Sequence, residues 1–226
     1  MDKSTNARRC LTGILALCIA LGMCFAWTGQ DVSAETKAVS TYDELRTAVN
    51  NVSGATTIQI DGLIAVEDTI TVPANANITF VSGDQAENGI KPAGSMGTTE
   101  SLIKIAKGAI FTMEITGDGD LVIDGDSKTS APLIESAGDF IMNSGKITGS
   151  AEAETASYGG GVYLTGSGQF VMNRGEISGN KTYYMDDSKH SDADSFGGGG
   201  VYVSSGTTFT MNGGIIKENV GHAGGG

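Results

Sequence analysis

The feature that most constrains the fold is a short block that recurs three times in the second half of the chain. The blocks read Phe-x-Met-Asn, begin at Phe140, Phe170 and Phe209, and are followed at fixed spacing by a glycine and an isoleucine. The phrase Gly-Gly-Gly-Val-Tyr precedes two of them, with Val162 and Val201 equally far ahead of the phenylalanine. Because self-similarity at a period of about 30 residues is the signature of a repeat architecture, the sequence predicts a solenoid.

Each repeat unit holds three short apolar segments separated by small polar residues. Within a segment, apolar residues alternate with others, as in Phe-x-Met and Val-x-Leu, which is typical of a strand with one buried face. Three such strands per unit predict an all-β fold, a parallel β-solenoid in which successive turns stack about 4.8 Å apart. The longer interval between blocks holds an insert, residues 181–196, so insertions fall in one loop of the unit.

Stacking of the turns predicts ladders of like residues. Three ladders are expected inside the solenoid: Phe140, Phe170 and Phe209; Met142, Met172 and Met211; and Ile147, Ile177 and Ile216. A fourth is expected at a corner, where side-chain amides can stack and bond turn backbone: Asn143, Asn173 and Asn212. The frequent glycines are expected at corners that need positive φ or close approach between coils.

Earlier segments fit the same unit more loosely. Residues 102–105, 111–115 and 121–123 predict one three-strand turn, and Leu133 opens the next. A first turn is predicted from three further apolar segments: 57–60, 69–72 and 78–81. The chain should therefore form about five turns.

The two ends of this solenoid differ. A short helix over residues 41–51 is predicted to cap the first turn, because Thr41 and Glu44 have capping-box spacing. One face of this helix carries the apolar residues Tyr42, Leu45 and Val49. Residues 223–226 read as the start of another glycine phrase. We therefore expect the chain to be a fragment, with more turns and any wall or membrane anchor downstream.

Residues 1–34 are predicted to be a secretory signal peptide. Lys3, Arg8 and Arg9 precede an apolar run, and a small-residue site ends at Ala34. The alternative is a retained membrane anchor, but the apolar run is short of the ~20 residues that span a bilayer. This divides the chain into the leader, an N-terminal segment with the helix (35–52) and the repeats (53–226), and leaves no membrane segment after cleavage.

Cysteine usage agrees with this division. The three cysteines all lie in the leader, at Cys10, Cys18 and Cys24, so the remaining chain forms no disulfide. The residues before Cys24 distantly resemble a lipoprotein box, although Met23 stands where a small residue belongs, and lipidation of Cys24 stays an alternative. The formal net charge of −12 argues against a nucleic-acid partner, which needs a basic face.

The body of the chain resembles the right-handed, single-stranded parallel β-helix superfamily often called pectin-lyase-like. The pairing of Gly-Gly-Val-Tyr at 160–163 and 199–202 with the Phe-x-Met-Asn blocks at 170 and 209 is similar to the repeats of polymorphic outer-membrane proteins. The resemblance implies a bacterial surface adhesin displayed as a β-helical passenger. Because polysaccharide lyases and glycoside hydrolases share the superfamily, it also implies an alternative function as an enzyme.

Residues for catalysis are therefore sought among the charged side chains. The candidate acids are Asp118, Asp120, Asp124 and Asp126, with Lys104 and Arg174 as candidate bases. Two of the acids occur in Asp-Gly pairs at predicted turns, where aspartate is favoured for bonding its own backbone. We expect turn acids and no catalytic residues.

Metal and cofactor sites are not expected either. The insert gathers four carboxylates and His190 over residues 185–194, but it lacks the spacing of a calcium loop and reads as a solvated loop. The glycine runs lack the Gly-Lys-Ser/Thr of a phosphate loop. His190 and His222 have no neighbours that suggest a triad.

Tyrosines offer the candidate ligand-binding surface. If Val162, Leu164, Val201 and Val203 point inward, Tyr163 and Tyr202 point outward at the same place on adjacent turns. Tyr183 and Tyr184 of the insert could extend the patch. Stacked exposed aromatics can hold sugar rings or a partner protein; simple strand packing is the alternative. The sequence thus favours an exported, non-catalytic adhesin or scaffold that binds host or matrix glycans or surface proteins.

Overall fold

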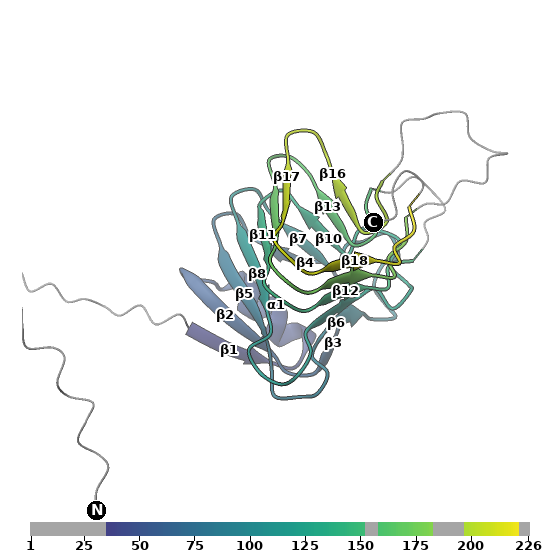
Figure 1. The fold of residues 1–226 in the computed structure, drawn as a ribbon. Helices are drawn as coiled ribbons and strands as arrows, with labels where there is room; N and C mark the ends of the chain where they lie inside the picture. Colours follow the sequence, from purple (N-terminus) through teal and green to yellow (C-terminus); the bar gives the residue numbers. More distant parts are fainter. Residues whose placement is uncertain (1–34, 152–157, 183–196, 222–226) are drawn as a thin grey trace, which may run out of the picture. The chain divides into compact units, whose positions relative to one another are not determined.

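The computed structural model describes residues 35–151, 158–182 and 197–221, and Figure 1 shows their fold. Within these residues the strands pair in parallel and form three sheets, and α1 (Tyr42–Asn50) is the helix. The all-β prediction is confirmed, and the parallel sheets are compatible with a β-helix. None of the helices in the described ranges combines the length and apolar character needed to cross a membrane.

The sheets are named here by their number of strands. The seven-stranded sheet contains, in order, β1 (Glu35–Val39), β2 (Ala55–Ile60), β5 (Asn77–Ser82), β8 (Ile110–Glu114), β11 (Asp139–Met142), β14 (Gln169–Met172) and β17 (Thr208–Met211). The six-stranded sheet contains β3 (Leu63–Val66), β6 (Gly89–Pro92), β9 (Val122–Asp124), β12 (Lys146–Thr148), β15 (Glu176–Ser178) and β18 (Ile215–Lys217). The five-stranded sheet contains β4 (Ile70–Val72), β7 (Ile103–Ile105), β10 (Ile134–Ser136), β13 (Val162–Leu164) and β16 (Val201–Val203).

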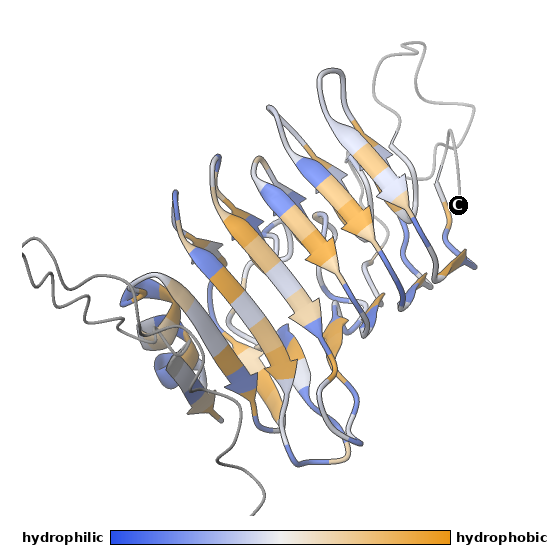
Figure 2. Cartoon of the chain, turned by 60° about the vertical axis from the view of Figure 1, so that its left-hand side comes forward, coloured by the Kyte–Doolittle hydropathy of each residue, from blue (hydrophilic) through white to orange (hydrophobic). Residues whose placement is uncertain are grey.

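The three predicted internal ladders are confirmed by the strand register. Phe140 pairs with Phe170 and Phe170 with Phe209, and the methionine and isoleucine ladders pair in the same way. The Phe140 and Phe170 rings stack with centroids 4.6 Å apart. Figure 2 shows the result as apolar bands that recur from strand to strand across the seven-stranded sheet. Alternation of period two therefore puts one face of the strands from β2 to β15 in a common core, whereas Val203 of β16 and Met211 of β17 are exposed.

We call a run of the chain that contributes one strand to each sheet, such as β2, β3 and β4, a coil. Asparagine side chains link successive coils at the predicted corner. Asn173 donates from Nδ2 to Oδ1 of Asn143, and Asn212 donates in the same way to Asn173, both at 2.8 Å. A second ladder, which the sequence analysis did not predict, is buried: Asn180 accepts from Ser150 and lies against Asn219. These amide bonds fix the register of one coil on the next.

The capping helix is confirmed. Thr41 is the N-cap residue of α1: its hydroxyl accepts from the Glu44 N–H, and the Glu44 carboxylate accepts from the Thr41 N–H. Leu45 and Val49 are buried, and Tyr42 packs against the core. The helix contacts β1, β3 and β4, so it covers the beginning of the strand stack.

The first predicted turn needs a correction. Residues 78–81 belong to β5, which pairs directly with β2 in the seven-stranded sheet, so they begin the next coil and do not close the first. The missing strand is β3, in which Ile64 and Val66 are buried and Leu63 is exposed. Its sequence is apolar throughout, which hides the alternation. β1 and β6 were not predicted either.

Several expectations concern residues outside the described ranges. These are the leader 1–34 with its cysteines, most of the insert 181–196 including Tyr183, Tyr184 and His190, and His222 with residues 223–226.

Candidate ligand-binding surface

Two tyrosines that the sequence analysis singled out lie next to each other in the five-stranded sheet. Tyr163 of β13 pairs in register with Tyr202 of β16, and their ring centroids are 5.7 Å apart. Val162 and Leu164 on either side of Tyr163 are fully buried. Because side chains alternate along a strand, Tyr163 points to the outer face of the sheet, and both rings are half-buried there.

A third tyrosine completes the group, and we call Tyr158, Tyr163 and Tyr202 the tyrosine cluster. The Tyr158 ring stacks on Tyr163 and tilts against Tyr202, with centroids 5.3 Å away in both cases. Tyr158 is 40% exposed. The repeat pattern could not reveal it, because Gly197 occupies the equivalent place in the next coil.

The two Gly-Gly-Gly-Val-Tyr segments bring Tyr163 and Tyr202 together. A Cβ on Gly161 would lie 2.6 Å from the Gly200 carbonyl oxygen of the next coil, and a Cβ on Gly160 equally close to that of Gly199. The Val162 N–H donates to the Gly200 carbonyl at 2.9 Å, which begins the pairing of β13 with β16. Glycine is therefore required here for the close approach of two backbones.

An ion pair continues the outer row of the five-stranded sheet beyond the tyrosine cluster. Glu135 of β10 pairs in register with Tyr163 on one side and with Lys104 of β7 on the other. Its Oε2 lies 3.3 Å from the Lys104 Nζ. The row therefore presents two aromatic rings, a carboxylate and an ammonium group on successive strands.

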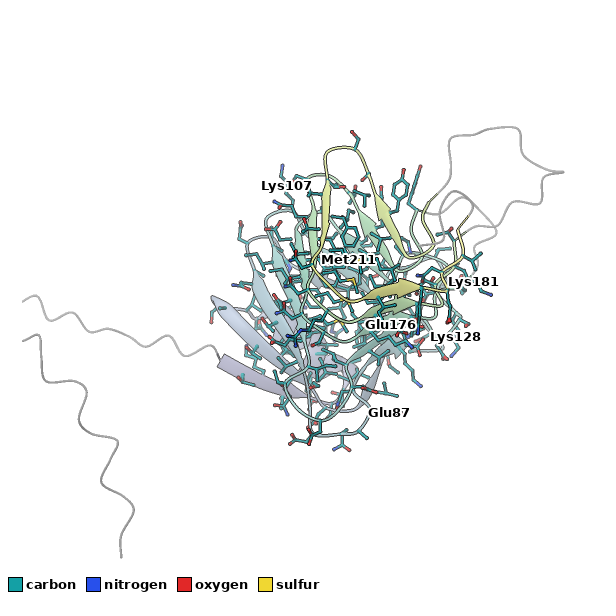
Figure 3. All side chains as sticks on the ribbon, in the orientation of Figure 1. Glu87, Lys107, Lys128, Glu176, Lys181 and Met211 are labelled. Atoms are coloured by element: carbon teal, nitrogen blue, oxygen red, sulfur yellow. The ribbon has the colours of Figure 1, made fainter. Side chains whose placement is uncertain are left out.

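The six-stranded sheet carries a second charged group on its outer face. Glu176, labelled in Figure 3, lies between two lysines. Its carboxylate is 3.1 Å from Lys146 Nζ and 3.3 Å from Lys217 Nζ, and it accepts from the Ser178 hydroxyl at 2.6 Å. The Ser178 hydroxyl, followed by the lysines, lowers the pKa of Glu176 to about 2. This carboxylate is ionised at neutral pH, so it has no proton to give as a general acid.

The candidate catalytic acids lie in or beside turns. Asp118 and Asp120 are exposed, and the Asp126 N–H donates to the Asp124 carboxylate at 2.8 Å. Lys128 bonds Asp126 and lowers its pKa. The Asp124–Asp126 bond is the local backbone bonding that favours aspartate in turns.

Within the described residues the candidate bases make no ion pair with these acids. Lys104 of the five-stranded sheet pairs with Glu135, and the ion pair of Asp126 is with Lys128. Across residues 35–151, 158–182 and 197–221, the acidic, histidine and cysteine side chains form no group of three that could hold a metal ion.

A groove of about 470 Å³ lies between β1 and α1, away from the tyrosine cluster. Its walls include Lys37, Asp43 and Thr47. The Lys37 ammonium bonds the Asn51 carbonyl at 3.2 Å, and Asp43 bonds Arg46. The first bond joins β1 to the end of the helix, and the second lies within α1, so these charged groups already have partners. The tyrosine cluster is therefore the better candidate for a ligand.

Comparison with known proteins gives no relative: no family model, no curated protein and no solved structure matches the chain.

Proposed function

We propose that the chain is an exported bacterial surface protein, a non-catalytic adhesin or scaffold that binds a glycan at the tyrosine cluster. In this proposal the strands form a right-handed parallel β-helix of about five turns, like the pectin-lyase-like and adhesin repeats that the sequence resembles. The observation that carries the proposal is the meeting of Tyr158, Tyr163 and Tyr202 on the outer face of one sheet.

The chemistry of tyrosine supports a sugar ligand. A phenol ring offers a flat apolar face to the C–H groups of a pyranose, and its hydroxyl can bond the sugar hydroxyls. The three rings lie with centroids 5.3 to 5.7 Å apart, so one sugar could contact more than one of them. The neighbouring Glu135 carboxylate adds a hydrogen-bond acceptor within one strand spacing.

The distribution of cysteine supports export. Cleavage after Ala34 would remove Cys10, Cys18 and Cys24 with the leader. Since no cysteine follows Cys24, the released chain would fold without disulfides in an oxidising compartment.

A glycan array tests the ligand. We expect the purified protein to bind a subset of glycans, and Tyr163→Ala and Tyr202→Ala to weaken binding about ten-fold or more, because aromatic anchors dominate such surfaces. Thr112→Ala, on the outer face of the seven-stranded sheet, is the matched control and should bind like the unchanged protein. Equal binding by the tyrosine variants would refute the proposed site.

The Lys104–Glu135 pair supports a second candidate, a polysaccharide lyase or glycoside hydrolase, because it sets an acid and a base beside the tyrosine cluster. Incubation with pectins separates the two functions. The adhesin proposal expects binding without products. Release of unsaturated oligosaccharides, followed by their ultraviolet absorbance, would overturn it in favour of a lyase.

A further inference from the structure

The outer face of the five-stranded sheet presents one side chain per strand. Its strands have three residues each, and in β4, β7, β10 and β13 the first and third residues are buried. The middle residue of each strand therefore points outward. The resulting outer row is, in register order, Thr71, Lys104, Glu135, Tyr163 and Tyr202.

The order of the outer row decides which charge a ligand would meet beside the rings. Glu135 is the register partner of Tyr163, about 4.8 Å away across the sheet, whereas Lys104 lies one strand further on. The Glu135 carboxylate bonds Lys104, yet its side chain keeps 33% of its surface exposed. Because a carboxylate has two acceptor oxygens, it can hold Lys104 and still accept from a ligand. A positively charged group is therefore favoured next to the rings, and a negatively charged one is disfavoured.

The rings of the tyrosine cluster favour a cation as well. A tyrosine ring attracts a cation over its face, since the ring quadrupole is negative there. This protein makes one such contact itself, with the Arg46 guanidinium 5.4 Å from the centroid of the Tyr42 ring. In the tyrosine cluster, Tyr202 is tilted by 46° and 47° against Tyr158 and Tyr163. The ring faces therefore point in more than one direction, so a cation can lie over one ring and beside another.

The charge of the whole chain has the same sign as Glu135. The formal net charge is −12 at pH 7. A field of this sign raises the concentration of cations at the protein surface and lowers that of anions, and salt weakens the effect. The neighbouring carboxylate, the ring faces and the overall charge thus favour the same class of ligand.

We propose that the glycan bound at the tyrosine cluster carries protonated amines, as an oligomer of glucosamine does. This inference rests on the proposed function, and it adds the chemical class of the ligand. An ammonium group of the glycan lies against a ring face and donates to the Glu135 carboxylate, while a pyranose ring stacks on a neighbouring tyrosine. Because a charge-assisted hydrogen bond is stronger than one between neutral groups, Glu135 favours the amine, and the tyrosines hold the sugar ring.

Three hexasaccharides test the class of ligand: one of glucosamine, its N-acetylated counterpart and one of galacturonic acid. Their affinities for the full chain are measured by isothermal titration calorimetry in mildly acidic buffer of low ionic strength, in which glucosamine is protonated. We expect the glucosamine oligomer to bind about ten-fold more tightly than the N-acetylated oligomer, and the galacturonic acid oligomer to bind most weakly. The first two share the same sugar ring and linkage, so their difference reports the change from acetamide to ammonium.

Two variants separate the role of the Glu135 carboxylate from that of its ion pair. Glu135→Gln and Lys104→Gln both break the bond between these residues, but only the first removes the carboxylate. We expect Glu135→Gln to abolish the preference for the amine and to leave binding of the N-acetylated oligomer nearly unchanged. Lys104→Gln should retain the preference, and Tyr163→Ala should weaken the binding of both oligomers.

The possible failures of this inference and of the proposed function are distinguishable. Failure of the glucosamine oligomer to bind, equal affinities for it and the N-acetylated oligomer, or tighter binding of the galacturonic acid oligomer would overturn the inference. The glycan site would still stand if other glycans bind and Tyr163→Ala weakens them. A preference that survives in Glu135→Gln would also overturn the inference, since the overall charge would then select the amine. Absence of binding by all three oligomers and by every glycan of the array would remove the proposed function itself.

Discussion

At the residue scale, Glu176 shows how one side chain on an outer face can join three coils. It bonds Lys146 of the preceding coil and Lys217 of the following coil, and the Ser178 hydroxyl within its own strand. These partners favour the ionised carboxylate, which is why the pKa of Glu176 falls to about 2. The group therefore contributes stability that depends on pH.

The sign of this dependence follows from the lowered pKa. The carboxylate stabilises the fold fully above its unfolded pKa of about 4.5, and the contribution is lost as the pH falls through about 2. We expect Glu176→Gln to lower the free energy of unfolding by about 1 kcal/mol at pH 7, the size usual for partly exposed pairs. Urea denaturation at pH 7 and pH 3 should show the difference between variant and unchanged protein shrinking at the lower pH.

Glu114→Gln is the control for this measurement. Glu114 ends β8, and within the described ranges it makes no ion pair. Its substitution should leave the free energy of unfolding unchanged at both pH values. A constant deficit of the Glu176 variant at pH 7 and pH 3 would contradict the assignment of the effect to ionisation.

At the element scale, the corners decide whether strands of neighbouring coils can pair. We expect Gly161→Ala to destabilise the fold by about 3 kcal/mol, because the new methyl group would meet the Gly200 carbonyl at 2.6 Å and backbone cannot yield as a side chain can. Thermal unfolding followed by circular dichroism measures the change.

The control lies in a corner with free space. A Cβ on Gly94 would meet no atom within 4 Å. Gly94→Ala should therefore be neutral or slightly stabilising, through the unfolded state. Similar melting temperatures for the two variants would show that close approach to the Gly200 carbonyl does not require glycine at position 161.

The elements also show what a sequence can and cannot reveal. The strands from Phe140 onward were predictable because each repeats a pattern, and α1 because Thr41 and Glu44 form a capping box. β3 was missed since all four of its residues are apolar, and β6 since Gly89 and Pro92 are poor strand residues. Tyr158 joins the candidate site through a packing contact that no repeat encodes. The tyrosine pair itself was predictable because register and period two determine it.

At the scale of the whole molecule, the coils form a line in which each contacts its neighbours, so the effect of a substitution depends on its place in the line. Phe140 stacks between Phe111 and Phe170, whereas Phe209 stacks on Phe170 and is half-buried. We expect Phe140→Ala to cost about 3–5 kcal/mol of unfolding free energy and Phe209→Ala about half as much.

Urea denaturation of both variants measures this difference. The two substitutions remove the same atoms, so each is the other's matched control. Equal losses of unfolding free energy would contradict this prediction, which rests on the exposure of Met211 on the same strand as Phe209.

The parallel stacking of the coils also fixes the distances between groups on an outer face. Adjacent strands lie about 4.8 Å apart, so whatever an outer face carries is displayed at whole multiples of that spacing from the closed end at α1. Deleting or duplicating one coil between α1 and Tyr163 would move the tyrosine cluster by one such step and leave its local geometry unchanged. The distance of the tyrosine cluster from α1 and the chemistry of its binding can therefore vary independently in a protein of this design.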